Sequence, residues 1–181
     1  MADSNITKLA AKIELLLLDV DGVLTDGKFL LVPMPDGSVV EAKAFDAQDG
    51  SGIGLARRAG IKLGIISGRL SPAVTRRAEE LRLHFCYQGL GRKKLEAFDE
   101  IVRTAGLPLD RICFVGDDLQ DLPILRRVGF PVAVGNACAE AKMAAAYITE
   151  KNGGHGAVRE IIEVILRAQG KWDTAISEFF L

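Results

Sequence analysis

The sequence predicts an α/β fold, in which a Rossmann-like parallel sheet carries helices on both faces. Short apolar runs at 13–18, 61–66 and 111–115 are typical of buried parallel strands. Segments with helical patterns lie between these runs, so strands and helices alternate along the chain. We expect a single domain over residues 1–181, because this length supports one sizeable core rather than two.

A β-hairpin is expected directly after the first strand. That strand stops at the Asp-Val-Asp-Gly turn that begins with Asp19. Two strand-like segments follow at 28–32 and 38–44, and a Pro-Asp-Gly turn signal at 35–37 separates them. The sequence therefore predicts a flap hairpin at about 28–44, inserted between the first strand and the first long helix.

Helix signals occupy the spaces between the later strands. Ser71 and Pro72 supply an N-cap and a first-turn proline for a helix that runs to about Leu81. The segment 94–105 is amphipathic, with its apolar residues on one face. The remaining helices are expected at 50–59, 119–128, 138–145 and 158–169, the remaining strands at 85–87 and 131–134, and a C-terminal tail at about 170–181.

Composition excludes several classes of function. The 23 basic and 24 acidic residues leave a net charge of −1, so nucleic acid is not an expected partner. No membrane segment is expected, because the apolar run at 15–18 is far too short to cross a bilayer. Cys86, Cys113 and Cys138 are widely spaced and odd in number, which suits a reducing cytoplasm.

An aspartate pair follows the first predicted strand. Because the chain turns after this strand, the carboxylates of Asp19 and Asp21 can face one cleft. Two such charges repel each other unless a cation or a shared proton relieves them, and Mg²⁺ prefers oxygen ligands of this kind. Asp19 can also attack phosphorus as a nucleophile, while Asp21 can exchange protons with the leaving group and with water. Gly22 allows the sharp turn near a phosphate.

A second acidic group follows the strand at 111–115. Asp117 is the expected metal ligand, and Asp118 is either a second ligand or a residue that orients water. Asp121 lies one helical turn further on and can hold the loop by accepting backbone N–H bonds. An N-cap box at the start of the following helix is the alternative role for Asp118 and Asp121.

The strand at 61–66 ends in a third polar group. The Ser67 hydroxyl and the backbone N–H groups around Gly68 can bind phosphate oxygens, and Arg69 can bind a substrate carboxylate. Phosphate also requires a positive partner, and the basic segment 92–94 is the expected source. Strand ends of a parallel sheet meet at one edge, so these groups are expected to converge there.

Taken together, these motifs resemble the haloacid dehalogenase superfamily of aspartate-nucleophile phosphatases. The motifs DxDGVLTDG, IISGR, a basic residue before a helix, and GDDxxD occur in the order of that superfamily. Further segments, among them Lys43-Ala44-Phe45 and the glycine-rich stretch at 153–160, are similar to its small branch without a cap domain. The resemblance covers nearly the whole chain.

The resemblance implies a Mg²⁺-dependent phosphatase of lipopolysaccharide sugar synthesis that acts on an eight-carbon sugar-acid phosphate. It implies Asp19 as nucleophile and Asp21 as general acid and base. Mg²⁺ would be held by the Asp19 side chain, the Asp21 backbone carbonyl and Asp117. Ser67 and a lysine would bind the phosphate. Lys93 fits the family's loop length and Lys94 its helix register, and we favour Lys94.

The resemblance also implies contacts beyond the phosphate. Asp49, Gly50 and Arg69 are candidates for binding the sugar acid, although Asp49 can equally cap the helix predicted at 50–59. The related enzymes are homotetramers, in which the flap hairpin meets neighbouring subunits and helps to close the site. Their C-terminal tail reaches towards an adjacent active site, a role that would fall here to Phe179-Phe180-Leu181.

Three alternatives remain open at this point. The same catalytic set would serve another sugar-acid phosphate, such as a nonulosonate 9-phosphate. A non-catalytic oligomerisation module is disfavoured because Asp19, Asp21 and Asp117 are all present. A receiver-type phosphoacceptor domain also carries an aspartate on an α/β sheet, but the hairpin after the DxDGVLTDG loop fits it poorly.

Overall fold

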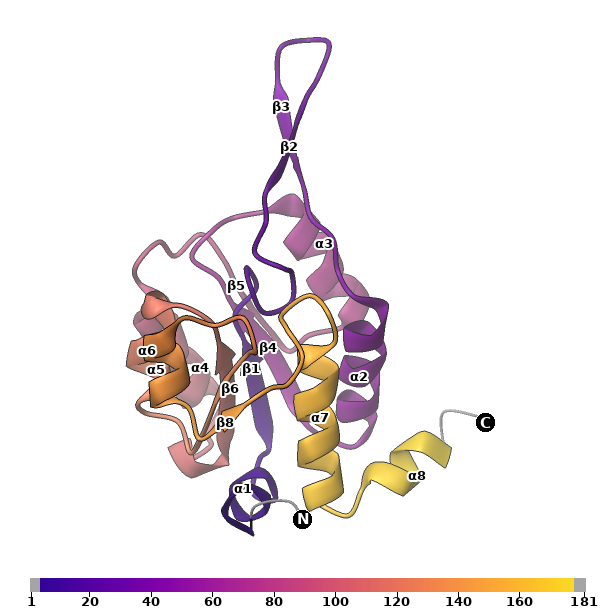
Figure 1. The fold of residues 1–181 in the computed structure, drawn as a ribbon, viewed down its shortest axis with the longest axis vertical. Helices are drawn as coiled ribbons and strands as arrows, with labels where there is room; N and C mark the ends of the chain where they lie inside the picture. The colour runs from indigo at the N-terminus through magenta and orange to yellow at the C-terminus, as the bar shows by residue number, and fades with distance from the viewer. Residues whose placement is uncertain (1–3, 178–181) are drawn as a thin grey trace.

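A computed structural model describes residues 4–177, which contain a six-stranded parallel sheet and a separate two-stranded hairpin (Figure 1). The sheet has the order β5-β4-β1-β6-β7-β8. Its strands are β1 (Leu15–Leu18), β4 (Lys62–Ile66), β5 (Phe85–Tyr87), β6 (Ile112–Gly116), β7 (Phe130–Ala133) and β8 (Tyr147–Ile148). The antiparallel hairpin consists of β2 (Leu30–Pro33) and β3 (Val39–Ala42) and protrudes from the body. The predicted fold class is confirmed.

Helices flank the sheet on both sides (Figure 1). α2 and α7 pack against each other, with α1 and α8 beside them, while α5 packs against α4 and α6. The helices are α1 (Ser4–Ala10), α2 (Ala47–Arg58), α3 (Pro72–Leu81), α4 (Lys94–Ala105), α5 (Leu122–Leu125), α6 (Ala139–Ala144), α7 (Ala157–Ala168) and α8 (Trp172–Ser177). Short 3-10 turns occur at Leu109–Arg111 and Leu119–Asp121. No second domain covers the strand ends within residues 4–177.

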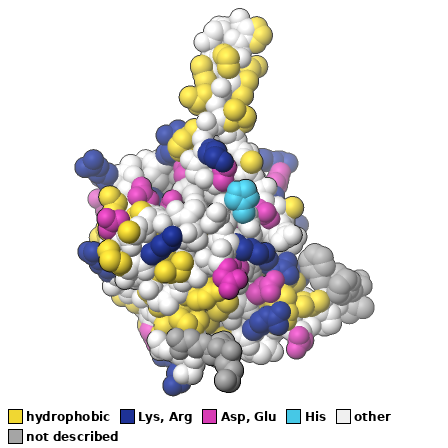
Figure 2. All heavy atoms as spheres, viewed as in Figure 1, with side chains coloured by type: hydrophobic (Ala, Val, Ile, Leu, Met, Phe, Trp, Pro, Cys, Tyr) yellow, Lys and Arg dark blue, Asp and Glu magenta, His cyan; other side chains and the backbone are white. Residues whose placement is uncertain are grey.

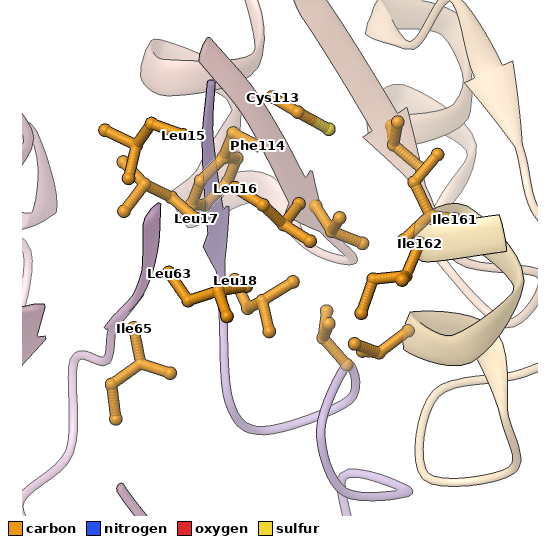
Figure 3. Packing of buried hydrophobic residues seen from close by; sticks show 14 of the residues in the cluster. Leu15, Leu16, Leu17, Leu18, Leu63, Ile65, Cys113, Phe114, Ile161 and Ile162 are labelled. Carbon is orange, nitrogen blue, oxygen red and sulfur yellow. The ribbon is translucent and has the colours of Figure 1, made fainter. Parts of the chain in front are cut away.

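The core forms around β1, whose four leucines are completely buried. β4 and β6 pair with β1 on either side, and Leu63, Ile65 and Phe114 pack close to its leucines (Figure 3). A strand buried on both faces needs such a continuous apolar run, and each leucine contributes about 1.5–3 kcal/mol through burial. This rigid centre fixes the positions of the loops that follow β1, β4 and β6.

The strand order reverses beside β1. The chain passes from β1 to β4 and β5 on one side, and then crosses over to β6, β7 and β8 on the other. Connections therefore leave in opposite directions at the β1/β6 boundary, and ligands of such folds bind at this switch point. The loops that carry Asp19 and Asp117 lie at this boundary.

Some sequence predictions required correction. The helix expected at 50–59 begins at Ala47, because Asp46 is its N-cap and accepts hydrogen bonds from the backbone N–H groups of Gln48 and Asp49. The helix expected at 119–128 is a 3-10 turn followed by the short α5. α1 and α8 were not expected. The prediction for Phe179-Phe180-Leu181 lies outside the described residues.

Candidate active site

A cavity of about 310 Å³ opens where β1, β4 and β6 end. Its walls contain four aspartates, the buried Lys94 and the ring of Phe29. The loop after β4, residues 67–69, forms another part of the wall and is called the serine loop below. The residues lining it are Asp19, Asp21, Gly27, Phe29, Ser67, Gly68, Arg69, Lys94, Asp117, Asp118 and Gln120. The three predicted strand-end groups therefore converge, although nearly 100 residues separate Asp19 from Asp117.

Lys94 forms the cationic centre of the cavity. It is the first residue of α4, and its Nζ lies 2.8 Å from Asp19 Oδ1 and 2.9 Å from Asp121 Oδ1. Lys93 instead points to solvent, with 71% of its side chain exposed and Glu96 as its ion-pair partner. The packing register of α4 thus brings Lys94, and not Lys93, to the predicted nucleophile.

Asp121 holds the loop after β6, as the sequence predicted. Its Oδ2 accepts hydrogen bonds from the backbone N–H groups of Asp117 at 2.9 Å and Asp118 at 3.4 Å. Its Oδ1 accepts the bond from Lys94, so both oxygens of this fully buried carboxylate are satisfied. Asp121 therefore fixes the position of Asp117. Asp118 is exposed at the rim and caps the following 3-10 turn.

Asp117 lies directly against Gly22. Gly22 has a φ of 97°, and a Cβ atom there would lie 2.1 Å from Asp117 Oδ2. Glycine is required on both counts, because other residues avoid this backbone region and would collide with the carboxylate. The close approach brings oxygens of Asp19, Asp117 and Asp121 within 4.8 Å of one another.

These crowded carboxylates are electrostatically strained. Burial and the charge of Asp121 raise the pKa of Asp19 to about 7, although Lys94 opposes the shift. Burial and the charges of Asp19 and Asp121 raise the pKa of Asp117 to about 8. For Lys94, burial opposes the charged form, but Asp19 and Asp121 outweigh it and raise the pKa above its ordinary value.

The donor set fits a hard divalent cation. Three carboxylates against one ammonium leave a local charge of −2 when all are ionised. Asp117 Oδ1 is buried and has no hydrogen-bond partner within residues 4–177. Asp121 is already saturated, so the available ligands are Asp19 and Asp117, and oxygen ligands of this kind suit Mg²⁺. The Asp21 side chain is turned to Lys43, which leaves its backbone carbonyl as the predicted ligand.

The serine loop faces the same cavity. The Ser67 hydroxyl oxygen accepts a hydrogen bond from the Arg69 backbone N–H at 3.2 Å. Its O–H donates no hydrogen bond within residues 4–177, so it can donate one to an anion. Gly68 lines the cavity where space is narrow, since a Cβ atom there would lie 3.0 Å from the Gly91 carbonyl oxygen. The Arg69 guanidinium lies 4.1 Å from the centroid of the Phe29 ring and binds Glu41 at 2.6 Å.

Asp49 and Gly50, which we expected to contact the sugar acid, do not line this cavity. Asp49 is buried, and its Oδ1 accepts a hydrogen bond from the Arg159 backbone N–H at 2.8 Å, in the first turn of α7. It therefore caps a helix 110 residues away rather than its own, which Asp46 caps. Gly50 lies against Arg77, whose guanidinium would be 2.4 Å from a Cβ atom there.

Sequence reasoning missed four residues around the cavity. Phe29 and Gln120 line it, while Lys43 and Glu41 lie behind Asp21 and Arg69. All but Gln120 come from the flap hairpin and its flanks, whose position over the strand ends no local pattern indicates. The Lys43-Ala44-Phe45 segment carries part of the family resemblance, but nothing in its spacing assigns Lys43 a contact.

Comparison with known proteins agrees with this geometry. Residues 89–162 match the haloacid dehalogenase-like hydrolase family. The chain is 42% identical, over 166 residues, to 3-deoxy-D-manno-octulosonate 8-phosphate phosphatase KdsC of Escherichia coli K12, and the match covers 92% of this chain and 86% of that protein. Among the residues the structure describes, no helix combines the length and apolar character that crossing a membrane requires.

Two solved structures are similar over almost the entire chain. The crystal structure of the phosphatase of the same name from Moraxella catarrhalis, in complex with magnesium, phosphate and KDO, has a TM-score of 0.89 and 40% identity, covering 98% of this chain and 99% of that one. A probable YrbI family phosphatase from Pseudomonas syringae has a TM-score of 0.90 and 40% identity, covering 99% of both chains. The chain therefore belongs to the family of 3-deoxy-D-manno-octulosonate 8-phosphate phosphatases, within the haloacid dehalogenase-like hydrolases.

Proposed function

We propose that this phosphatase hydrolyses 3-deoxy-D-manno-octulosonate 8-phosphate to the free sugar acid and inorganic phosphate. The observation that carries the proposal is the buried Asp19 carboxylate, which faces the cavity beside Lys94 and Asp117. The name of the Escherichia coli relative supports the substrate, and so does the KDO bound in the Moraxella catarrhalis structure. The geometry of the cavity thus supports the phosphatase reaction, and the relatives support the substrate.

Mg²⁺ is the proposed cofactor, held by the side chains of Asp19 and Asp117 and by the backbone carbonyl of Asp21. When bound, it supplies positive charge for the phosphate oxygens and for the carboxylates. The unpartnered Asp117 Oδ1 and the raised pKa values of Asp19 and Asp117 support this assignment. The magnesium in the Moraxella catarrhalis structure supports it further.

The chain's own residues account for two chemical steps. In the first, an Asp19 carboxylate oxygen attacks phosphorus, the bond from phosphorus to the sugar oxygen breaks, and Asp21 gives that oxygen a proton. In the second, Asp21 takes a proton from water, whose oxygen attacks phosphorus and releases phosphate and the Asp19 carboxylate. Lys94, 2.8 Å from Asp19, offsets the negative charge that gathers in both steps.

The remaining cavity residues are proposed to bind the substrate. Ser67 and the backbone at Gly68 would donate hydrogen bonds to phosphate oxygens, since the Ser67 proton is available. Arg69 lines the cavity and carries a planar fork that suits the carboxylate of a sugar acid. Phe29 supports this side chain by stacking against it, so Arg69 would meet the substrate in a defined orientation.

Phosphate release from a panel of sugar-acid phosphates tests this function. We expect Mg²⁺-dependent turnover that favours the octulosonate 8-phosphate, and none from Asp19→Asn. If kcat/KM were higher for a nonulosonate 9-phosphate than for the octulosonate 8-phosphate, the proposed reaction would stand and the proposed substrate would be wrong. Absence of any turnover with Mg²⁺ by a folded wild-type protein would leave a non-catalytic oligomerisation module as the better description.

We further propose that the chain forms a homo-oligomer, expected to be a tetramer, through the flap hairpin. Leu30, Leu31 and Val39 are each at least 60% exposed in the single chain, and Figure 2 shows apolar side chains gathered along the protruding hairpin. A lone two-stranded hairpin is marginally stable in water, so contact with further copies would stabilise it. In that assembly a neighbouring chain would help to close the cavity.

Sedimentation of the full chain tests the assembly. The wild type should sediment as a tetramer, and Leu30→Ser combined with Leu31→Ser should shift it to smaller species. Met143→Ser is the control, since Met143 is apolar and even more exposed than Leu30 and Leu31 but lies on α6, far along the chain from the hairpin. A monomeric wild type at micromolar concentration would contradict the proposal.

The cytoplasm is the proposed compartment. Cys86, Cys113 and Cys138 are all free thiols, as expected of a protein in a reducing environment. Fractionation of cells that express the full chain should recover it with other cytoplasmic enzymes, and recovery in a periplasmic extract would overturn the assignment.

A further inference from the structure

A chain of alternating charges links the base of the flap hairpin to the cavity. Lys43 follows β3 and contacts Asp21 Oδ1 with its Nζ, which also lies 3.3 Å from Glu41 Oε1. The second oxygen of Glu41 lies 2.6 Å from the Arg69 guanidinium. The order Asp21, Lys43, Glu41, Arg69 thus connects the proposed general acid and base to the proposed carboxylate-binding residue.

Phe29 lies between the two cations of this chain. The Lys43 Nζ is 4.7 Å from its ring centroid and the Arg69 guanidinium 4.1 Å, so both interact with its π system. Phe29 precedes β2 and Lys43 follows β3, so the two arms of the hairpin meet at this ring. The network therefore fixes the base of the hairpin on the catalytic loop.

Lys43 is buried to an unusual degree for a lysine. Its side chain is 1% exposed, whereas lysines are rarely buried without a partner. Removing an ammonium group from water is unfavourable, and the contacts with Asp21, Glu41 and the ring offset that cost. Lys43 does not line the cavity, so a direct contact with substrate is not what holds it there.

Asp21 depends on a partner of this kind. It lies on the turn after β1, not in a regular element, and one of its oxygens is taken by Lys43. Asp21 nevertheless lines the cavity, and 18% of its side chain is exposed. An acid or base must lie within hydrogen-bond reach of the proton it transfers, and a displacement of about 1 Å can cost roughly 100-fold in rate.

We propose that Lys43 is a positioning residue, which orients the Asp21 carboxylate for proton transfer and couples that orientation to the base of the flap hairpin. The inference rests on the proposed function, because it needs Asp21 to transfer protons. It gives the base of the hairpin a role in the active site of its own chain, in addition to the proposed contact with neighbouring chains.

A double-mutant cycle tests the proposal. Wild type, Lys43→Met, Asp21→Asn and the double variant are compared for kcat and KM, with Mg²⁺ and the octulosonate 8-phosphate. We expect Lys43→Met to lower kcat about 10- to 100-fold with KM within threefold, because orientation and not binding is lost. In the Asp21→Asn background the same substitution should change kcat less than threefold, because there is no proton transfer left to orient.

Two further variants separate positioning from general damage. Lys28→Met is the matched control, since Lys28 lies beside the hairpin but is 84% exposed and pairs with Asp26; it should keep wild-type kcat. Lys43→Arg retains the charge and should recover most of the lost rate. If Lys43→Met does not fold, Lys43→Gln replaces it in the same cycle.

The outcomes are distinct. Equal losses in both backgrounds, a change confined to KM, or wild-type kcat in Lys43→Met would each overturn the positioning role while leaving the phosphatase intact. A folded wild type that releases no phosphate from any sugar-acid phosphate would remove the proposed function, and this inference with it.

Discussion

Replacing Asp19 with Asn should abolish turnover and, at alkaline pH, stabilise the metal-free protein. Burial and neighbouring charge raise the pKa of Asp19 from 3.8 to about 7. Three pKa units correspond to about 4 kcal/mol against the ionised form. Asn removes that charge but adds an NH₂ group, and a poorly bonded buried polar group costs about 1–3 kcal/mol. We therefore expect a net gain of about 2 kcal/mol in the free energy of unfolding at pH 8.

The raised pKa of Asp19 also determines how the stability difference between Asp19→Asn and wild type changes with pH. A carboxyl group whose folded pKa is raised disfavours folding above that pKa and has no such effect below its unfolded pKa. The ionisation penalty on the wild type should thus be full at pH 8, shrink as the pH falls below 7, and vanish near pH 4. Because the cost of the buried Asn amide does not change with pH, the advantage of Asp19→Asn should cross zero at about pH 5 and become a deficit of about 2 kcal/mol near pH 4. Urea unfolding in EDTA at several pH values measures it. A variant that is less stable than wild type at pH 8, or whose advantage grows in acid, would refute the electrostatic reasoning.

Three further predictions concern neighbouring residues. Lys94→Met should lower kcat at least 100-fold in a phosphate-release assay and Lys93→Met less than threefold, because Lys94, unlike Lys93, contacts Asp19. Similar losses in the two variants would contradict the α4 register. Asp49→Asn should leave kcat/KM unchanged and raise the unfolding free energy by up to about 3 kcal/mol at pH 8 but not below pH 4, because burial raises the Asp49 pKa to about 6; lost activity would return Asp49 to the site. Gly22→Ala should weaken Mg²⁺ binding at least 10-fold by calorimetry, because its Cβ atom displaces Asp117, and unchanged affinity would argue against the proposed ligand.

Much of the fold was predictable because the central strands β1, β4 and β6 are buried on both faces. The run at 15–18 has no alternative to the centre of a parallel sheet, and the strand at 85–87 and the helix at 94–105 have the predicted bounds. α8 had no comparable signal. It spans Trp172–Ser177 and contacts α2 and α7, and the guanidinium of Arg167 lies 4.7 Å from the centroid of the Trp172 ring. Tertiary packing, not local pattern, accounts for it.

The site was predictable wherever a motif ends a strand. Asp19, Ser67 and Asp117 each follow a buried strand, and the parallel topology brings those ends together. The role of Asp49 could not be predicted in this way. By sequence Asp49 is either a sugar-acid ligand or the cap of its own helix, whereas the structure gives that cap to Asp46 and pairs Asp49 with the first turn of α7. Contacts between elements far apart in sequence decide such cases.

Hydrogen-bond satisfaction separates the structural from the functional carboxylates around the cavity. Asp121 is fully buried, yet both its oxygens accept hydrogen bonds from Lys94 and the loop backbone, and its place is fixed. Asp117, four residues earlier, keeps a buried oxygen without a partner within residues 4–177 and a raised pKa. A buried oxygen without a partner destabilises the fold, and the proposed Mg²⁺ at Asp117 would offset that cost. The motif GDDxxD contains both residues, and only their surroundings distinguish Asp121, which holds the loop, from Asp117, the proposed metal ligand.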